Sequence, residues 1–174
     1  KLAKKTGARL NVFHISTAVE LNLFDNSIEL YDKKITSEVC AHHLWFTDKN
    51  YNELGSKIKW NPAIKSENDR DALWQAVKDN KIDIIASDHA PHTIEEKKKD
   101  YPNSPSGMTG VQTLLPIMLN FVNKNKLSIF DLVKLVCINP CKIFNIKDKG
   151  EVKIGYDADL TIIDMNKEFI ISND

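Results

Sequence analysis

Hydrophobic positions along the chain alternate between two periods, one typical of strands and one typical of helices. Short apolar segments predict three buried strands, at residues 9–14, 34–40 and 82–87. Segments with polar starts and helical spacing of their apolar residues predict helices, at residues 16–24, 48–54 and 66–80. Strands and helices that alternate in this way are typical of βα units with a parallel sheet, so we expect an α/β fold.

Two of these helices have recognisable starts. Ser66 and Asp69 open the helix at 66–80, and its apolar face makes Trp74 a core residue rather than a ligand contact. Thr17 and Glu20 have the spacing of a capping box and open the helix predicted at 16–24.

The second half of the chain begins with a long polar segment. Residues 93–110 contain two prolines and two glycines, which predicts a lid or substrate loop, with a flexible connector as the alternative. Two apolar helices follow at 111–123, with a kink expected at Pro116, and at 128–139, where Asn139 and Pro140 should end the helix.

From residue 149 onwards the pattern is short, alternating and interrupted by turn residues. It predicts a small antiparallel sheet. We therefore place a domain boundary near Asp148 and expect two parts, residues 1–148 and 149–174.

Composition excludes some classes of partner. Lys plus Arg and Asp plus Glu number 24 each, so no net charge favours nucleic acid or an anionic membrane surface. The run Lys97–Lys99 lies among acidic residues, which predicts a solvated loop. No apolar run approaches the roughly 20 residues of a membrane span. We expect neither a nucleic-acid nor a membrane partner.

The three cysteines, Cys40, Cys137 and Cys141, include no C-x-x-C pair. They predict free thiols and a reducing, cytoplasmic location. The first residue is Lys1, within a helix-like stretch, which indicates that the chain begins further upstream.

Histidines collect where the predicted strands end. The sequence has five, and each falls at or just after a strand's carboxyl end: His14, His42, His43, His89 and His92. In parallel sheets this edge binds ligands, and histidine with aspartate can hold a divalent metal. A single histidine there is more often a packing residue, but five at one edge favour a metal site.

The strand period limits which of these side chains can meet. His42 and His43 are adjacent, so in a strand at most one would face the site, and the same holds for Asp88 and His89. Asp88 and His92 are separated by a proline turn and can converge. Ser16 and Thr17 near His14 could belong to a Ser-His hydrolase, but the chain has no G-x-S-x-G elbow.

Several longer segments resemble dihydroorotases of the amidohydrolase superfamily, in order and over essentially the whole chain. They are HISTA at 14–18, SEVCAHHLWFTD at 37–48, KWNPAIKSENDRDALWQAV at 59–77, IASDHAPH at 85–92, PSGMTGVQTLLPIML at 105–119 and GYDADLTIID at 155–164. The resemblance implies the C-terminal portion of a (β/α)8 TIM-type barrel with part of a small β-sandwich domain. Strands six, seven and eight would end at His14, the His42 and His43 pair, and Asp88.

The resemblance also implies roles for individual residues. His14 would be a metal ligand, and Asp88 a metal ligand and the catalytic base, in a site for one or two Zn²⁺ ions. The H-x-H pair and the ligands of strands four and five are absent from these 174 residues, so the segment alone should be inactive and should need the upstream half of the same barrel.

The implied reaction converts (S)-dihydroorotate reversibly to N-carbamoyl-L-aspartate in pyrimidine biosynthesis, with a metal-activated hydroxide and Asp88 as base and then acid. Asn61 and His92 would hold the small-molecule substrate, and Ser106 with Gly107 would contact it through the loop. A homodimer is the expected assembly.

Other functions remain open. Allantoinase and hydantoinase or dihydropyrimidinase share the barrel, although Asn61 and His92 favour a carboxylated substrate because they supply donors. A metal-free dihydroorotase-like subunit would be non-catalytic, but it would not need His14 and Asp88. An independent half-barrel binding module is disfavoured because it would expose two sheet edges.

Overall fold

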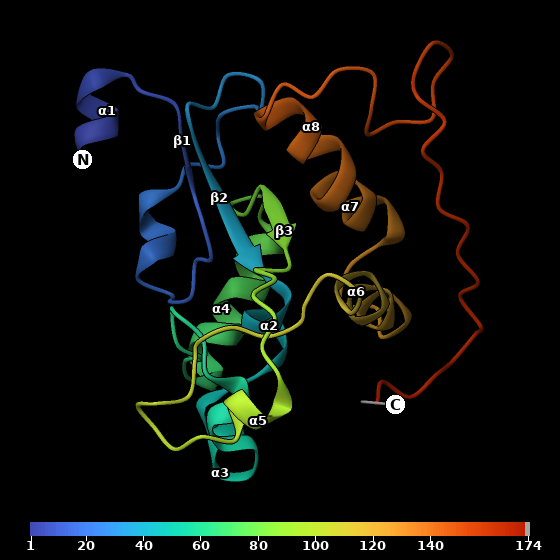
Figure 1. The fold of residues 1–174 in the computed structure, drawn as a ribbon. Helices are drawn as coiled ribbons and strands as arrows, with labels where there is room; N and C mark the ends of the chain where they lie inside the picture. The colour runs from blue at the N-terminus through green and yellow to red at the C-terminus, as the bar shows by residue number, and fades with distance from the viewer. Residues whose placement is uncertain (173–174) are drawn as a thin grey trace.

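A parallel three-stranded sheet lies at the centre of the protein (Figure 1). The computed structural model describes residues 1–172. Its strands are β1 (Leu10–Val12), β2 (Ile35–Cys40) and β3 (Ile84–Ala86), in the order β1-β2-β3. Leu10 pairs with Ile35 and Glu38 with Ile84, both in parallel register. The α/β fold with a parallel sheet is confirmed.

Short helices connect and cover these strands. The α-helices are α1 (Leu2–Thr6), α2 (Ala41–Trp45), α3 (Tyr51–Leu54), α4 (Glu67–Lys78), α5 (Ile94–Lys97), α6 (Leu114–Asn123), α7 (Ile129–Val133) and α8 (Asn139–Ile143). Single 3-10 turns occupy Glu20–Leu23, Asp48–Asn50 and Gly55–Ile58, and a π turn occupies Lys134–Ile138.

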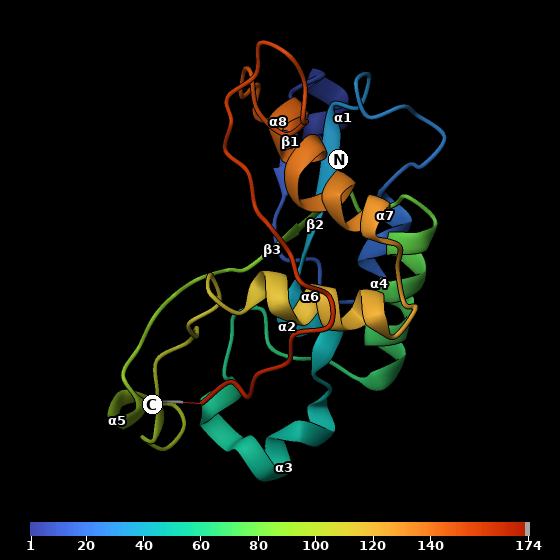
Figure 2. The same ribbon diagram turned by 90° about the vertical axis from the view of Figure 1, so that its right-hand side faces the viewer.

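The main core lies between the sheet and helices α4, α6 and α7. It includes Val39 and Ile85 from the sheet, Leu73 from α4, Met118 from α6 and Leu132 from α7, all nearly inaccessible to solvent. Figure 2 shows α6 and α7 one above the other beside the strands, with α4 next to them. Burial of this apolar surface is the main force that holds the sheet to its helices.

Helix α4 forms as predicted. The Ser66 hydroxyl accepts a hydrogen bond from the Asp69 N–H at 3.2 Å, which caps the helix. Trp74 is buried, and its indole N–H donates to the Leu44 carbonyl at 2.9 Å. The core role predicted for Trp74 is confirmed.

The helix predicted at 16–24 is wrong, although its capping contact exists. The Thr17 N–H donates to the Glu20 carboxylate at 2.9 Å, yet only a 3-10 turn follows. The Ala18 N–H donates to the Asp69 carboxylate of α4 at 2.9 Å, so a tertiary contact holds the start of the segment. Here a tertiary contact overrides the local helix propensity of the segment.

The two prolines predicted to kink or end helices do neither. Pro116 lies in the first turn of α6, where its missing N–H removes no helical bond. Asn139 and Pro140 begin α8 instead of ending the previous helix, and the chain stays helical to Ile143. Proline is tolerated in a first turn, and the Asn139 side chain fixes the junction by donating to the Asp83 carbonyl at 2.8 Å.

The antiparallel sheet predicted for the tail is absent from the described residues 149–172. The tail (red in Figure 1) runs along the outside, with Ile154 and Ile162 almost fully exposed. A strand needs the backbone of a partner for its hydrogen bonds, and no described strand pairs with the tail. The boundary near Asp148 stays a prediction.

At the amino end of the strands, the structure buries an ion pair. The Lys33 ammonium lies 2.7 Å from the Asp83 carboxylate, and both side chains are about 95% buried. The Ser37 N–H donates to the same carboxylate at 3.0 Å. This contact ties the segment before β2 to the start of β3.

Among residues 1–172, the structure contains no helix with the length and apolar character needed to span a membrane.

Candidate functional site

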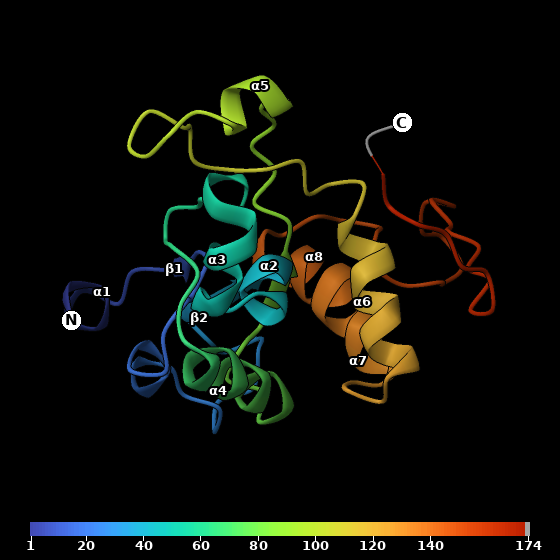
Figure 3. The same cartoon turned by 90° about the horizontal axis from the view of Figure 1, so that it is seen from below.

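The carboxyl ends of all three strands face the end of the molecule that carries α3 and α5 (Figure 1). Figure 3 looks onto this end and shows α2 in the middle, with α3, α4 and α6 around it. The histidines predicted to gather at the strand ends follow β1, β2 and β3 as expected.

His14 and Asp88 leave their strands in the same unusual way. Their backbones have φ angles of 41° and 47°, in the left-handed region that residues other than glycine rarely occupy. Each lies two residues beyond the end of its strand, β1 or β3, and each side chain is half-buried. Strained backbone of this kind is found at functional sites because the surrounding structure must hold it in place.

A half-buried carboxylate on β2, Glu38, lies close to both residues. Burial raises the pKa of Glu38, whereas the Asn11 hydrogen bond and the charge of His14 lower this pKa and the charge of Asp88 raises it. The Asn11 amide donates to Glu38 at 3.2 Å and accepts from the Thr36 hydroxyl at 2.8 Å. His14 and Asp88 therefore share an electrostatic neighbourhood around Glu38.

Sequence reasoning missed Glu38. The available signal was one acidic residue inside a strand whose neighbours are otherwise apolar or small. An ionisable group on a sheet residue near the ligand-binding edge is a functional candidate.

The adjacent histidines of α2 correct the strand-based expectation. Both His42 and His43 are buried, and their ring centroids lie 4.3 Å apart, because the chain turns into a helix directly after Cys40. The His42 ring stacks on Trp60 with centroids 3.8 Å apart and planes 6° apart. His43 Nε2 lies 3.1 Å from the carbonyl of Pro62. The two rings thus lie together instead of on opposite faces.

His89 faces the loop and not the strand ends. Its side chain is exposed, and Nδ1 accepts the N–H groups of Gly110 and Val111 at 3.0 and 3.2 Å. The expectation that Asp88 and His89 point apart agrees with this contact. Because these two N–H groups occupy the lone pair of Nδ1, this nitrogen holds the loop and is not available as a metal ligand.

The four residues expected to bind substrate form one connected cluster. The Asn61 amide donates to the Ser106 hydroxyl at 3.0 Å, and His92 Nε2 lies 3.1 Å from the Ser106 carbonyl. The Gly107 N–H donates to the carbonyl of Lys59 at 2.9 Å. Asp88 is not part of this set of contacts, since His92 turns towards Ser106.

Two lysines fix the loop that carries Ser106 and Gly107. Lys97 is 4% exposed, and its ammonium donates to the carbonyls of Lys59 and Pro105 at 3.1 and 2.9 Å. The Lys59 ammonium donates to the carbonyls of Pro102 and Ser104. Burial, and then the charge of Lys59, lower the pKa of Lys97.

This arrangement corrects two sequence predictions. Lys97 is a buried anchor and not part of a solvated charge run, because the loop folds back over its side chain. The segment 93–110 also contains the short helix α5, in which Thr93 and Glu96 form a capping box. A loop fixed by these contacts fits a substrate loop better than a flexible connector.

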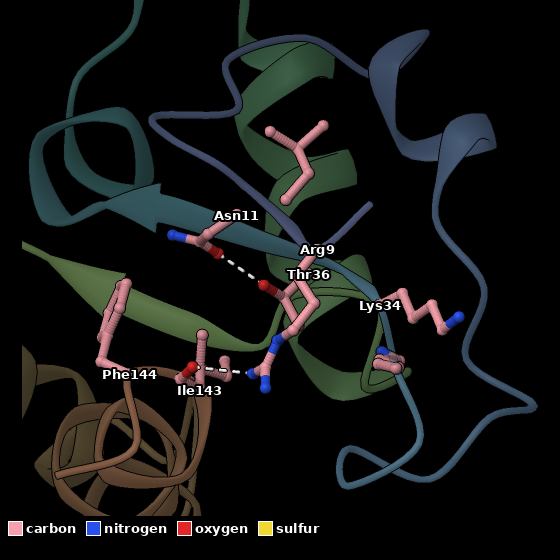
Figure 4. A pocket seen from close by; sticks show the side chains of 8 residues that line it. Arg9, Asn11, Lys34, Thr36, Ile143 and Phe144 are labelled. Carbon is pink, nitrogen blue, oxygen red and sulfur yellow. Dashed lines mark hydrogen bonds between the residues drawn. The ribbon is translucent and has the colours of Figure 1, made fainter. Parts of the chain in front are cut away.

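A cavity of about 180 Å³ lies at the opposite, amino end of the strands (Figure 4). Arg9, Asn11, Thr36 and Phe144 line it, and Arg9 donates to the Ile143 carbonyl at 2.9 Å. None of the residues predicted to bind metal or substrate lines it. The chemistry of the strand ends, and not the size of this cavity, favours the carboxyl edge of the sheet as the candidate site.

Known proteins match nearly the whole chain. A dihydroorotase from Methanosphaera stadtmanae is 40% identical over 172 residues, and one from Pyrococcus furiosus is 41% identical over 165 residues. These alignments cover 99% and 94% of the chain but 39% and 37% of the relatives. The chain therefore spans about two fifths of the length of the curated relatives it matches.

Solved structures share the fold. An L-hydantoinase (dihydropyrimidinase) from Arthrobacter aurescens superposes with a TM-score of 0.82 at 32% identity, covering 90% of this chain and 36% of that one. A dihydroorotase in complex with 5-fluoroorotic acid from Saccharomyces cerevisiae gives a TM-score of 0.75 at 19% identity, covering 84% and 41%, which supports the fold alone. The amidohydrolase family matches residues 13–174, and the chain belongs to this family.

Proposed function

We propose that the protein acts as a dihydroorotase, which converts (S)-dihydroorotate reversibly to N-carbamoyl-L-aspartate in pyrimidine biosynthesis. The observation that carries the proposal is the match to curated dihydroorotases at 34–41% identity along nearly the whole chain. The connected cluster of Asn61, His92 and Ser106 supports it, since these side chains offer hydrogen-bond donors to a carboxylated substrate.

We infer that the chain is part of a larger barrel. Residues 1–148 would form the C-terminal portion of a (β/α)8 barrel, and residues 149–174 part of a small β-sandwich. The open edges at β1 and β3 and the exposed apolar side chains of the tail support this assignment, because both need further chain to cover them. The upstream half of the barrel would supply that chain, and the whole protein would be a cytoplasmic homodimer.

His14 and Asp88 fit a metal site by their chemistry. An imidazole and a carboxylate are common zinc ligands, and both side chains are half-buried after parallel strands. Both also act electrostatically on Glu38 and His43, so they lie in one region. We infer one or two Zn²⁺ ions, with the remaining ligands supplied by the upstream half. When bound, such an ion polarises a carbonyl and makes water more acidic.

Asp88 would handle the proton. In the hydrolytic direction its carboxylate accepts a proton from the attacking water and later returns it to the ring nitrogen that leaves. The left-handed backbone at Asp88 holds the carboxylate beyond the end of β3, at the ligand-binding edge of the sheet.

The substrate cluster must open its own hydrogen bonds to bind a dianion. Asn61 donates to Ser106, and the Gly107 N–H is used by Lys59. A substrate carboxylate can replace the Ser106 hydroxyl as the acceptor for Asn61, and it can accept from that hydroxyl in turn. The Ser106 hydroxyl is thus the donor that this loop can offer to the substrate. Gly107 has no side chain, so the substrate can lie close to its backbone.

Steady-state assays of the complete protein on dihydroorotate, allantoin and dihydrouracil test the proposal. We expect dihydroorotate to have the highest kcat/KM, and the Asp88→Asn variant to lose at least ~1,000-fold in kcat because the base is removed. The exposed Asp71→Asn variant is the matched control and should keep full activity. Failure to turn over dihydroorotate would overturn the assignment.

A hydantoinase or dihydropyrimidinase is the second candidate, favoured by the L-hydantoinase structure with a TM-score of 0.82. The Asn61→Ala variant separates the two. It should raise KM for dihydroorotate, which carries a carboxylate, and leave KM for a neutral hydantoin unchanged. A non-catalytic subunit would show no turnover and no metal bound at His14 and Asp88.

A further inference from the structure

A second group of metal-binding side chains lies directly after β2. Cys40, His42 and His43 each offer one ligand atom, and the three atoms all lie within 4.8 Å of one another. None of the three residues is more than 6% exposed. The group uses three positions of a four-residue segment, CAHH, that crosses from strand β2 into helix α2.

The hydrogen bonds orient one histidine as a ligand. His43 Nε2 lies 3.1 Å from the Pro62 carbonyl, and a carbonyl only accepts, so Nε2 carries the proton. The other nitrogen, Nδ1, then presents a lone pair. Metal-bound histidines almost always donate their second N–H to a carbonyl or carboxylate, and His43 makes such a contact before any ion binds.

Two ring nitrogens of the group have no partner in the described part of the chain. His42 Nε2 and His43 Nδ1 are both inaccessible to solvent and make no hydrogen bond. An unpartnered polar atom in a protein interior costs free energy, so it needs a physical reason. Burial also lowers the pKa of His42 to about 2 and that of His43 to about 4, which keeps both rings neutral and able to coordinate.

Packing alone explains only part of this arrangement. The stack of His42 on Trp60 accounts for the position of one ring. The indole N–H of Trp60 is also without a partner, but it is a donor and does not ligate a cation. Stacking gives no role to the lone pair of His43 or to the thiol of Cys40.

We propose that Cys40, His42 and His43 bind one thiophilic divalent cation, Zn²⁺, in a ligand set of its own that does not include His14 or Asp88. Zinc bonds of ~2.3 Å to sulfur and ~2.0 Å to nitrogen in a tetrahedron place ligand atoms roughly 3.5 Å apart. Since the ligand atoms lie within 4.8 Å of one another, the group must contract by up to about 1.3 Å. The fourth position stays open for water or an anion.

Binding has a defined proton balance. Burial, with the charges of Asp88 and Glu38, raises the pKa of the Cys40 thiol, so it is protonated before the ion arrives. The S–H bond breaks, the Zn–S bond forms, and the proton leaves to solvent, while both rings are already neutral. One proton is therefore released for each ion that binds.

X-ray absorption at the zinc edge tests the proposal directly on the purified protein loaded with ZnCl₂. We expect a sulfur neighbour at ~2.3 Å, which the His14 and Asp88 site does not contain. The signal should vanish in Cys40→Ser and persist in Cys137→Ser and Cys141→Ser, the matched cysteine controls. Absence of sulfur in the wild type, or its persistence in Cys40→Ser, overturns the proposal.

Further variants keep the test decisive if Cys40→Ser folds poorly. The His43→Gln variant keeps the sulfur but loses one ligand, so the zinc dissociation constant should rise at least tenfold. The Asp88→Asn variant should keep the sulfur neighbour. An unchanged zinc dissociation constant in His43→Gln, or loss of the sulfur neighbour of zinc in Asp88→Asn, contradicts the proposed ligand set. Both measurements are independent of whether dihydroorotate is a substrate.

Discussion

The buried ion pair between Lys33 and Asp83 gives a sharp prediction for stability. In the Lys33→Met variant, the Asp83 carboxylate stays buried without its cation. Removal of one partner of a buried ion pair lowers the free energy of unfolding by ~3–5 kcal/mol, because the remaining charge is desolvated and unpaired. The Ser37 N–H still donates to Asp83 at 3.0 Å, which places the expected loss near the lower end, about 3 kcal/mol.

An exposed pair with the same geometry is the control. Lys49 and Glu67 also lie 2.7 Å apart, but their side chains are 73% and 47% exposed. Solvent screens such a pair, so Lys49→Met should change the free energy of unfolding far less than Lys33→Met does. The distance between nitrogen and oxygen is the same in both ion pairs, so the difference in burial is the reason for the different expected losses of stability.

Urea denaturation measures both losses. With an m value of ~2 kcal/mol per M, the urea midpoint should fall by about 1.5 M in Lys33→Met and should hardly change in Lys49→Met. The double variant Lys33→Met with Asp83→Asn removes both charges and keeps an acceptor for Ser37, so it should be more stable than Lys33→Met alone. Equal shifts in the two single variants would refute the reasoning, as would a double variant that is less stable than Lys33→Met.

Three further predictions concern the functional end of the molecule. Replacement of the buried Lys97 by Met should raise KM for dihydroorotate about tenfold with a smaller effect on kcat, because its charged hydrogen bonds to the carbonyls of Pro105 in the loop and of Lys59 are lost; a change in kcat alone would contradict this. Gly107→Ala should weaken substrate binding and cost ~1–3 kcal/mol, since its backbone has a φ of 106° and a Cβ would lie 2.5 Å from that of Ala90; urea midpoints and KM measure the two effects. In chelator-treated protein, the free energy of unfolding should fall as pH drops below 6.5, the pKa of an unfolded histidine. The cause is that the folded protein holds the pKa values of His42 and His43 lower, so protonation favours the unfolded state. The loss is about 2 kcal/mol for each ring at pH 5, and a variant with Gln at both positions should show a correspondingly flatter pH dependence of urea stability.

Sequence patterns were sufficient for the parallel sheet and for helix α4. Strand β2 is mostly buried, with only Ile35 and Glu38 partly exposed, and the start of α4 carries its own cap, so local and global preferences agree there. The histidines at the strand ends were found because position along a parallel strand determines which edge a residue occupies.

The rest depends on contacts that no local pattern contains. The turn at Glu20 is set by a carboxylate of α4, 49 residues further along the chain. The pairing of His42 with His43 depends on a switch from strand to helix at Cys40, where no proline or glycine marks the change. The sequence predicts a solvated Lys97 because its partners are the carbonyls of Lys59 and Pro105, which come together only when the loop folds over its side chain. Each miss follows from a tertiary interaction that overrides a local preference.

The two lysines of the substrate loop connect its stability to its chemistry. Among the described residues, the ammonium groups of Lys59 and Lys97 bond to backbone carbonyls, and neither forms an ion pair with a carboxylate. Carbonyl dipoles satisfy the hydrogen bonds but do not cancel the charge, so two positive charges stay next to the cluster of Asn61, His92 and Ser106. Under the proposed function, the same contacts that hold the loop would favour an anionic substrate over a neutral one. A hydantoin would gain nothing from these charges, whereas the dianion N-carbamoyl-L-aspartate would be attracted by both.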